Sequence, residues 1–98
     1  MITSFFPGRL RLRAPIFREA DLVGKALPIV RKNDAVKNVE NNLLTGSVLI
    51  EYDPDKVPLQ KLLSMQDFFT ALAEEAKHYD GTNRQKILSM LDELEKIF

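Results

Sequence analysis

The chain has 98 residues, 14 Lys and Arg against 14 Asp and Glu, and no cysteine. This length predicts one domain with a thin core, and zero formal net charge gives no bulk attraction to nucleic acid or anionic lipid. The lack of cysteine excludes disulfides, thiolate nucleophiles and cysteine metal sites, and no apolar run approaches the ~20 residues of a membrane span. We therefore expect a cytoplasmic protein without a membrane span.

The first half of the chain predicts a strand, a helix and a hairpin. Residues 9–13 alternate strictly between Arg and Leu, which is typical of a strand with one buried face, and Pro7-Gly8 precedes them as a bend. Residues 19–32 have apolar side chains at helical spacing, which predicts an amphipathic helix. Residues 36–44 and 48–52, separated by a Thr-Gly-Ser turn, predict two antiparallel strands.

The second half predicts helices only. Pro58 suits the first turn of a helix over residues 59–78, and Asp80-Gly81 ends that helix. Residues 82–85 match a capping box, and apolar residues at helical spacing follow up to residue 98. We expect residues 1–80 to form the main domain, with residues 81–98 as an amphipathic helix packed on it or extending from it.

The order strand, helix, hairpin, helix gives the βαββα core of an α+β ferredoxin-like sandwich. Residues 35–39, 42–48 and 51–54 resemble the second half of heavy-metal-associated (HMA) domains. With Pro7 to Arg13 in front, the chain is most similar to the cysteine-less branch of that family. The resemblance covers about residues 5–65 and implies an association with metal transport or homeostasis.

Family members that carry copper or zinc hold it with a CxxC pair between the first strand and the first helix. In one register this pair falls at Ile16 and Glu19, and in the other at Glu19 and Leu22. Because none of these positions is a cysteine, we expect the chain to bind no metal and no cofactor. His78 and the methionines form no recognisable ligand spacing either.

The family's fourth strand is missing from the sequence, because residues 82–98 predict a helix. In the usual ferredoxin-like order, the first strand pairs with both the third and the fourth. The resemblance therefore implies a three-stranded antiparallel sheet with residues 9–13 at its edge. An unpaired edge favours strand addition from another chain, so we expect a protein partner or a homodimer at this edge or at the last helix.

Our first functional hypothesis is a non-enzymatic interaction or regulatory domain. Its candidate surfaces are the outward Arg side chains of the first strand and loop, and the apolar side of the last helix. The sequence leaves open whether that helix completes the core or docks a partner. The candidate residues are Arg9, Arg11, Arg13, Arg18, Leu88, Leu91, Leu94 and Phe98.

Two alternatives remain at this point. Arg9, Arg11 and Arg13, on one outward face of the first strand, form an Arg ladder that could bind anions or nucleic acid, although Leu49 and Glu51 are poor stacking platforms for bases. The simplest role of this ladder is a solvated face with Glu51 as an ion-pair partner. Phe17-Arg18 resembles the phosphate loop of acylphosphatases, with Asn38 or Asn41 as the strand Asn. Pro15 removes a backbone donor that a phosphate loop needs, so we predict no enzyme.

Overall fold

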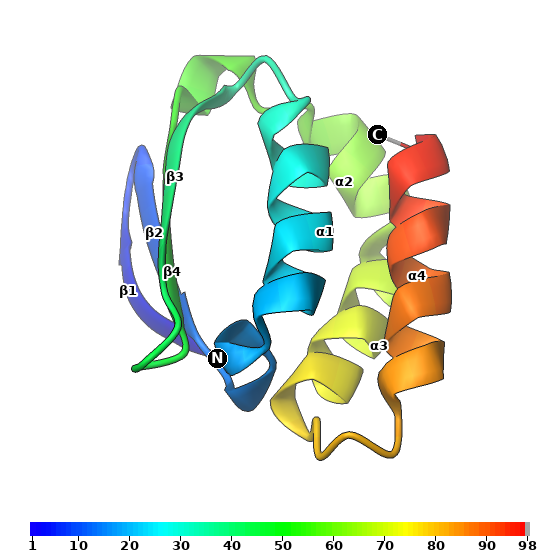
Figure 1. Ribbon diagram of the computed structural model, residues 1–98. Helices are drawn as coiled ribbons and strands as arrows, with labels where there is room; N and C mark the ends of the chain where they lie inside the picture. Colours follow the sequence, from blue (N-terminus) through cyan, green and yellow to red (C-terminus); the bar gives the residue numbers. More distant parts are fainter. Residues whose placement is uncertain (98) are drawn as a thin grey trace.

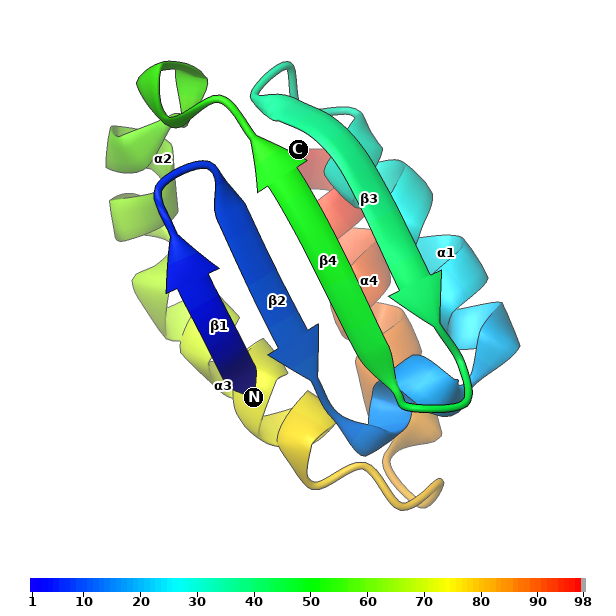
Figure 2. The same cartoon turned by 90° about the vertical axis from the view of Figure 1, so that its left-hand side faces the viewer.

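The computed structural model describes residues 1–97 and shows an α+β architecture. A four-stranded antiparallel sheet forms one layer, and the helices lie on one of its faces (Figure 1). Figure 2 looks onto the opposite face, which no helix covers. The predicted fold class, an α+β ferredoxin-like sheet with helices on one side, is confirmed.

The sheet has one strand more than predicted. Its order is β1 (Ile2–Phe6), β2 (Arg9–Arg13), β4 (Ser47–Tyr52), β3 (Val36–Asn42). The last three have the order expected for the first three strands of a ferredoxin-like core, and β1 takes the place beside β2 that a C-terminal strand usually fills. The prediction of three strands with residues 9–13 at the edge is therefore wrong, because β2 is an inner strand and β1 is the edge.

The strand β1 forms because a tight hairpin returns it onto β2. Gly8 has φ +87°, a conformation that glycine adopts without strain, and the turn brings Phe6 opposite Arg9. At the other end of the hairpin the amide of Arg13 donates to the carbonyl of Met1 at 2.7 Å. β1 was not predicted from the sequence, because adjacent Phe5 and Phe6 break the polar and apolar alternation that marks a half-buried strand.

The helix α1 (Ala20–Arg31) lies behind β3, whereas residues 59–77 lie toward the β1 side of the sheet (Figure 2). Val23 and Leu27 pack against β3 and β4, in one apolar cluster. Leu22 and Ile29 belong to a second cluster, which α3 (Gln66–Lys77) and α4 (Arg84–Ile97) share. Because α1 is apolar on both sides, it joins two thin cores into one molecule.

The predicted helix over residues 59–78 is divided in the structure. Met65 separates α2 (Leu59–Ser64) from α3 (Gln66–Lys77), with φ −106° and ψ 15°, outside the helical range. None of the side chains of α2 is buried, whereas α3 contributes Ala76 to the core. The break therefore leaves α2 as a short helix beside the sheet.

The last helix α4 (Arg84–Ile97) completes the core. Ile87 is fully buried, and Leu91 and Leu94 are buried beside it against α1 and α3. Of the two roles that the sequence left open, the structure supports packing onto the domain.

Glu75 fixes the turn between α3 and α4. Its backbone carbonyl and its carboxylate accept from Asn83 Nδ2 at 2.9 and 2.8 Å, and Lys86 Nζ lies 2.7 Å from the carboxylate. The bonds from Lys86 and then Asn83 lower the pKa of the Glu75 carboxyl below its ordinary value. The loop therefore holds α4 in place through polar contacts at its start.

Candidate functional site

The loop between β2 and α1 is the place where a metal-carrying relative would hold its ion. It contains the 3₁₀ turn η1 (Pro15–Arg18) and lies against the turn that joins β3 to β4. The amide of Ala14 donates to the carbonyl of Gly46 at 3.0 Å, and this bond ties the two turns together. The site is thus built from segments about thirty residues apart in the chain.

The positions that correspond to metal ligands are used for packing. Ile16 is 7% exposed and Leu22 is 1% exposed, and both belong to the cluster that α1 shares with α3 and α4. In each of the two registers, one ligand position is therefore a core residue, and only Glu19 remains partly accessible. Within residues 1–97, no group of three or more His, Cys, Asp or Glu side chains is arranged to hold a metal ion.

Two guanidinium groups lie over the turn at Gly46. Arg13 Nε donates to the carbonyl of Thr45 at 3.1 Å. The Arg18 side chain packs on Gly46, with Cγ and Nε at 3.1 and 3.4 Å from the position that a Cβ there would take. Neither arginine forms an ion pair with any of the described residues. The pocket between them has a volume of about 280 Å³ and is lined by Arg13, Ala14, Pro15, Arg18 and Thr45.

The other two arginines of β2 lie on the open face of the sheet. Arg9 is opposite Glu51 in register, but no ion pair joins them, and the Glu51 carboxylate accepts from Asn38 Nδ2 at 3.2 Å. The expected ion pair between the ladder and Glu51 is therefore not formed. Arg11 lies opposite Leu49 and shares a shallow hollow with Glu40. The three arginines of the ladder therefore have different neighbours.

The residues compared with an acylphosphatase site do not come together around Arg18. The Asn38 amide donates to the carboxylates of Glu40 and Glu51, at 3.4 and 3.2 Å. Asn41 lines the hollow that contains Arg11, and Arg18 lines the separate pocket at the loop. The two pockets share Thr45 in their linings, but Asn41 and Arg18 do not line the same pocket.

The two edges of the sheet differ in protection. On β3, Lys37 and Glu40 carry charge, and the carbonyl of Val39 accepts from Arg31 Nη2 at 3.2 Å. On β1 there is no charged residue, and Phe5 is 63% exposed. Charged side chains are a common guard against strand addition, so β1 is the less protected edge.

The leucines proposed on the last helix lie on the side of α4 that faces the domain. Leu91 and Leu94 are buried in the core, and Leu88 is half-buried against the same cluster. Phe98 lies outside the described residues. The apolar side of α4 that these three leucines form is therefore used within the domain.

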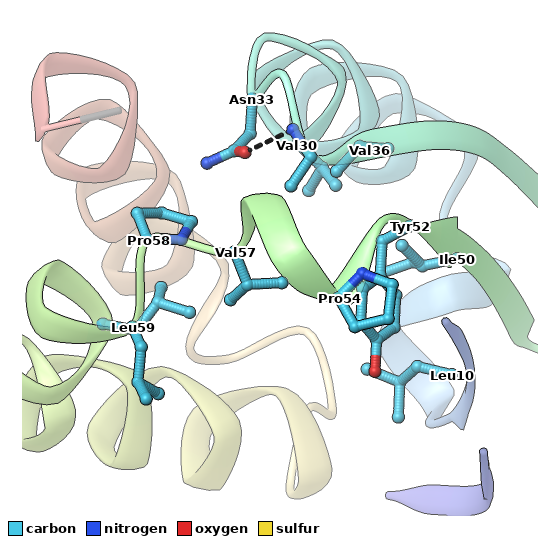
Figure 3. Close-up of a pocket in the computed structure, with 12 residues that line it drawn as sticks. Leu10, Val30, Asn33, Val36, Ile50, Tyr52, Pro54, Val57, Pro58 and Leu59 are labelled. Carbon is cyan, nitrogen blue, oxygen red and sulfur yellow. Dashed lines mark hydrogen bonds between the residues drawn. The ribbon is translucent and has the colours of Figure 1, made fainter. Parts of the chain in front are cut away.

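An apolar cavity of about 570 Å³, which the sequence analysis did not predict, opens between the inner face of the sheet and α2 (Figure 3). Its wall is formed by side chains such as Leu10, Ile50 and Leu59, and the Tyr52 ring lies beside Leu10. Leu59 and Leu62 line it, and their spacing of three residues within the helix predicted over residues 59–78 was the sequence signal for a shared apolar face. None of the helices in residues 1–97 has the length and apolar character to span a bilayer.

The family model for heavy metal associated domain 2 matches residues 1–96. The chain therefore belongs to the heavy metal associated domain 2 family. The matched range includes β1 and all of α4 except its last residue, so the family's domain extends beyond the central segment that carried the resemblance. No curated protein and no solved structure matches the chain.

Proposed function

We propose that this chain is a non-enzymatic interaction domain that acts through protein contact and does not carry a metal. The observation that carries the proposal is the placement of Ile16 and Leu22 in the core, with Glu19 between them as the only partly accessible ligand position. The family supports a role in metal homeostasis or transport, performed in this chain by binding another protein chain.

Soft metals need thiolate or imidazole ligands at short distances, and the loop offers neither. The single histidine, His78, lies at the end of α3, where its Nε2 is 3.4 Å from the Glu74 carboxylate. A carrier would also need ligands that a partner can reach in order to pass the ion on. Side chains packed into the core cannot serve that purpose.

Titration with copper(I) or zinc is expected to give no stoichiometric binding at submicromolar affinity, because the loop has no soft ligand. Competition with a chromogenic chelator measures this directly. The double variant Pro15→Cys with Arg18→Cys is the positive control, since both positions are exposed and have the family's spacing. Tight binding to the unmodified chain that disappears in Glu19→Ala would overturn the proposal.

The contact surface that we assign is the outer edge of β1, and its occupant is a second copy of this chain. Strand addition uses the unpaired backbone groups of an edge, and antiparallel self-pairing joins one edge to itself about a two-fold axis. Because β1 is uncharged, this pairing brings no like charges together, whereas β3 would bring Lys37 and Glu40 into the contact. The exposed Ile2, Phe5 and Phe6 would be partly covered.

Light scattering across protein concentration is expected to show a reversible monomer and dimer equilibrium. Phe5→Lys should raise the dimer Kd by roughly tenfold or more, because it brings two like charges to the two-fold contact. Leu44→Lys introduces the same charge in place of an exposed apolar side chain in the β3–β4 turn and should leave the Kd unchanged. A chain that stays monomeric at millimolar concentration, or an equal effect of both variants, would contradict this assignment.

A further inference from the structure

The Arg13–Arg18 pocket, defined by its five lining residues above, holds two positive charges without a counter-ion. The two side chains cross the same turn, and none of the ion pairs formed by the described residues includes either of them. Like charges held in one pocket repel each other, and a bound anion relieves that repulsion. The pocket therefore has the electrostatic character of an anion site.

Both side chains are held in position before any ligand binds. The bond from Arg13 Nε to the Thr45 carbonyl leaves the terminal Nη groups of that guanidinium available. The Arg18 side chain is packed along Gly46, where the absence of a Cβ makes room for it. Side chains that are already ordered lose little conformational entropy on binding, which favours affinity.

The arginine ladder of β2 is not uniform, and its Arg13 end borders a pocket that no acidic residue lines. Arg9 lies opposite Glu51, and Arg11 shares its hollow with Glu40. Arg13 lies opposite Ser47 instead, and Arg18 is added to it from the loop. Anion binding should therefore be confined to this end of the strand.

We infer that the Arg13–Arg18 pocket binds a small, doubly charged oxyanion of the phosphate type. Guanidinium groups present paired N–H donors that match two oxygens of such an ion. A volume of about 280 Å³ is small for a ligand pocket, which favours an inorganic ion or a single phosphoryl group. Pro15 has no backbone N–H, so the two guanidinium groups act as the donors. This site is independent of the β1 contact.

Inorganic phosphate at constant ionic strength is the probe, followed by NMR of the backbone amides and the arginine Nε–H groups. We expect saturable shifts at residues 13, 14, 16–18 and 45–46 with a Kd of about 1 mM or below. Arg18→Gln and Arg13→Gln should each weaken binding by roughly tenfold, because each removes one positive charge and one pair of guanidinium N–H donors. Arg9→Gln changes the charge equally on the same strand and should leave the Kd within about twofold.

Two further titrations separate the charge of the ligand from the geometry of its donors. Acetate at equal concentration should bind much more weakly than phosphate, because it carries one charge; equal affinity would overturn the assignment to a dianion. Arg18→Lys keeps the positive charge but lacks the paired N–H donors, so its affinity for phosphate should lie between those of the unmodified chain and Arg18→Gln. This intermediate affinity also separates a loss of ligand binding from a folding defect. Shifts that do not saturate, or that respond equally to Arg9→Gln and Arg18→Gln, would show only nonspecific attraction and would refute the site.

Discussion

Replacing Ile87 with Ala is expected to lower the free energy of unfolding by about 2–5 kcal/mol. Ile87 has no exposed surface, and it contacts the cluster that α1, α3 and α4 share. Truncation removes buried methyl groups and leaves a cavity that closely packed neighbours fill only partly. For a domain of this size the midpoint of thermal unfolding should fall by about 10 °C or more.

Thermal and urea unfolding followed by circular dichroism measure this effect. Ile97→Ala provides the matched control, because it makes the same chemical change on the same helix at a side chain that is 38% exposed. We expect that control to cost less than about 1 kcal/mol. Equal effects at the two positions would mean that α4 does not complete the core, and the division of the domain into two apolar clusters would have to be abandoned.

Replacing Gly46 with Ala is expected to destabilise the protein by about 2 kcal/mol or more. Gly46 has φ +66°, which costs a residue with a side chain energy, and the new Cβ would lie 2.7 Å from the carbonyl oxygen of Ala14. That carbonyl belongs to the loop backbone and cannot move without displacing β2. The Arg18 side chain would also be pushed away, so phosphate binding should weaken together with stability.

Gly24→Ala is the control with the opposite sign. Gly24 is exposed within α1, and a Cβ there would have no heavy atom within 4 Å apart from the local backbone. Ala has a higher helix propensity than Gly and less freedom in the unfolded chain, so this variant should be stabilised by about 0.5–1 kcal/mol. Urea midpoints of the two variants test the pair, and a stabilised Gly46→Ala would contradict the described turn geometry.

The loop between β2 and α1 has no metal ligands, and its packing in the structure differs from that of a metal-binding loop. A metal loop must present its ligands to solvent, whereas here Ile16 faces the core and Ala14 bonds to the neighbouring turn. The exposed charged side chains of the loop are Arg13 and Arg18, which attract anions and not metal cations. The loop that would hold a metal cation in a metal-carrying relative is therefore suited to an anion in this chain.

The sequence by itself determined the local elements and the missing chemistry. The alternation of Arg and Leu predicted β2, and the helical spacing of apolar residues predicted α1. The Thr-Gly-Ser turn predicted the hairpin of β3 and β4. Each of these patterns lies within one short segment of the chain. The absence of cysteine is likewise a property of composition. The family frame was recognisable from the same short segments.

Only the tertiary structure decided which strand is the edge, which helix face is buried, and which arginines meet. β1 has no periodicity of its own and is defined by its pairing with β2, while the apolar face of α4 looks the same in sequence whether it meets a core or a partner. Arg13 and Arg18 share a pocket because a turn some thirty residues away lies beneath both. Such contacts depend on the distances between segments that are far apart in the chain, and local sequence patterns contain no information on these distances.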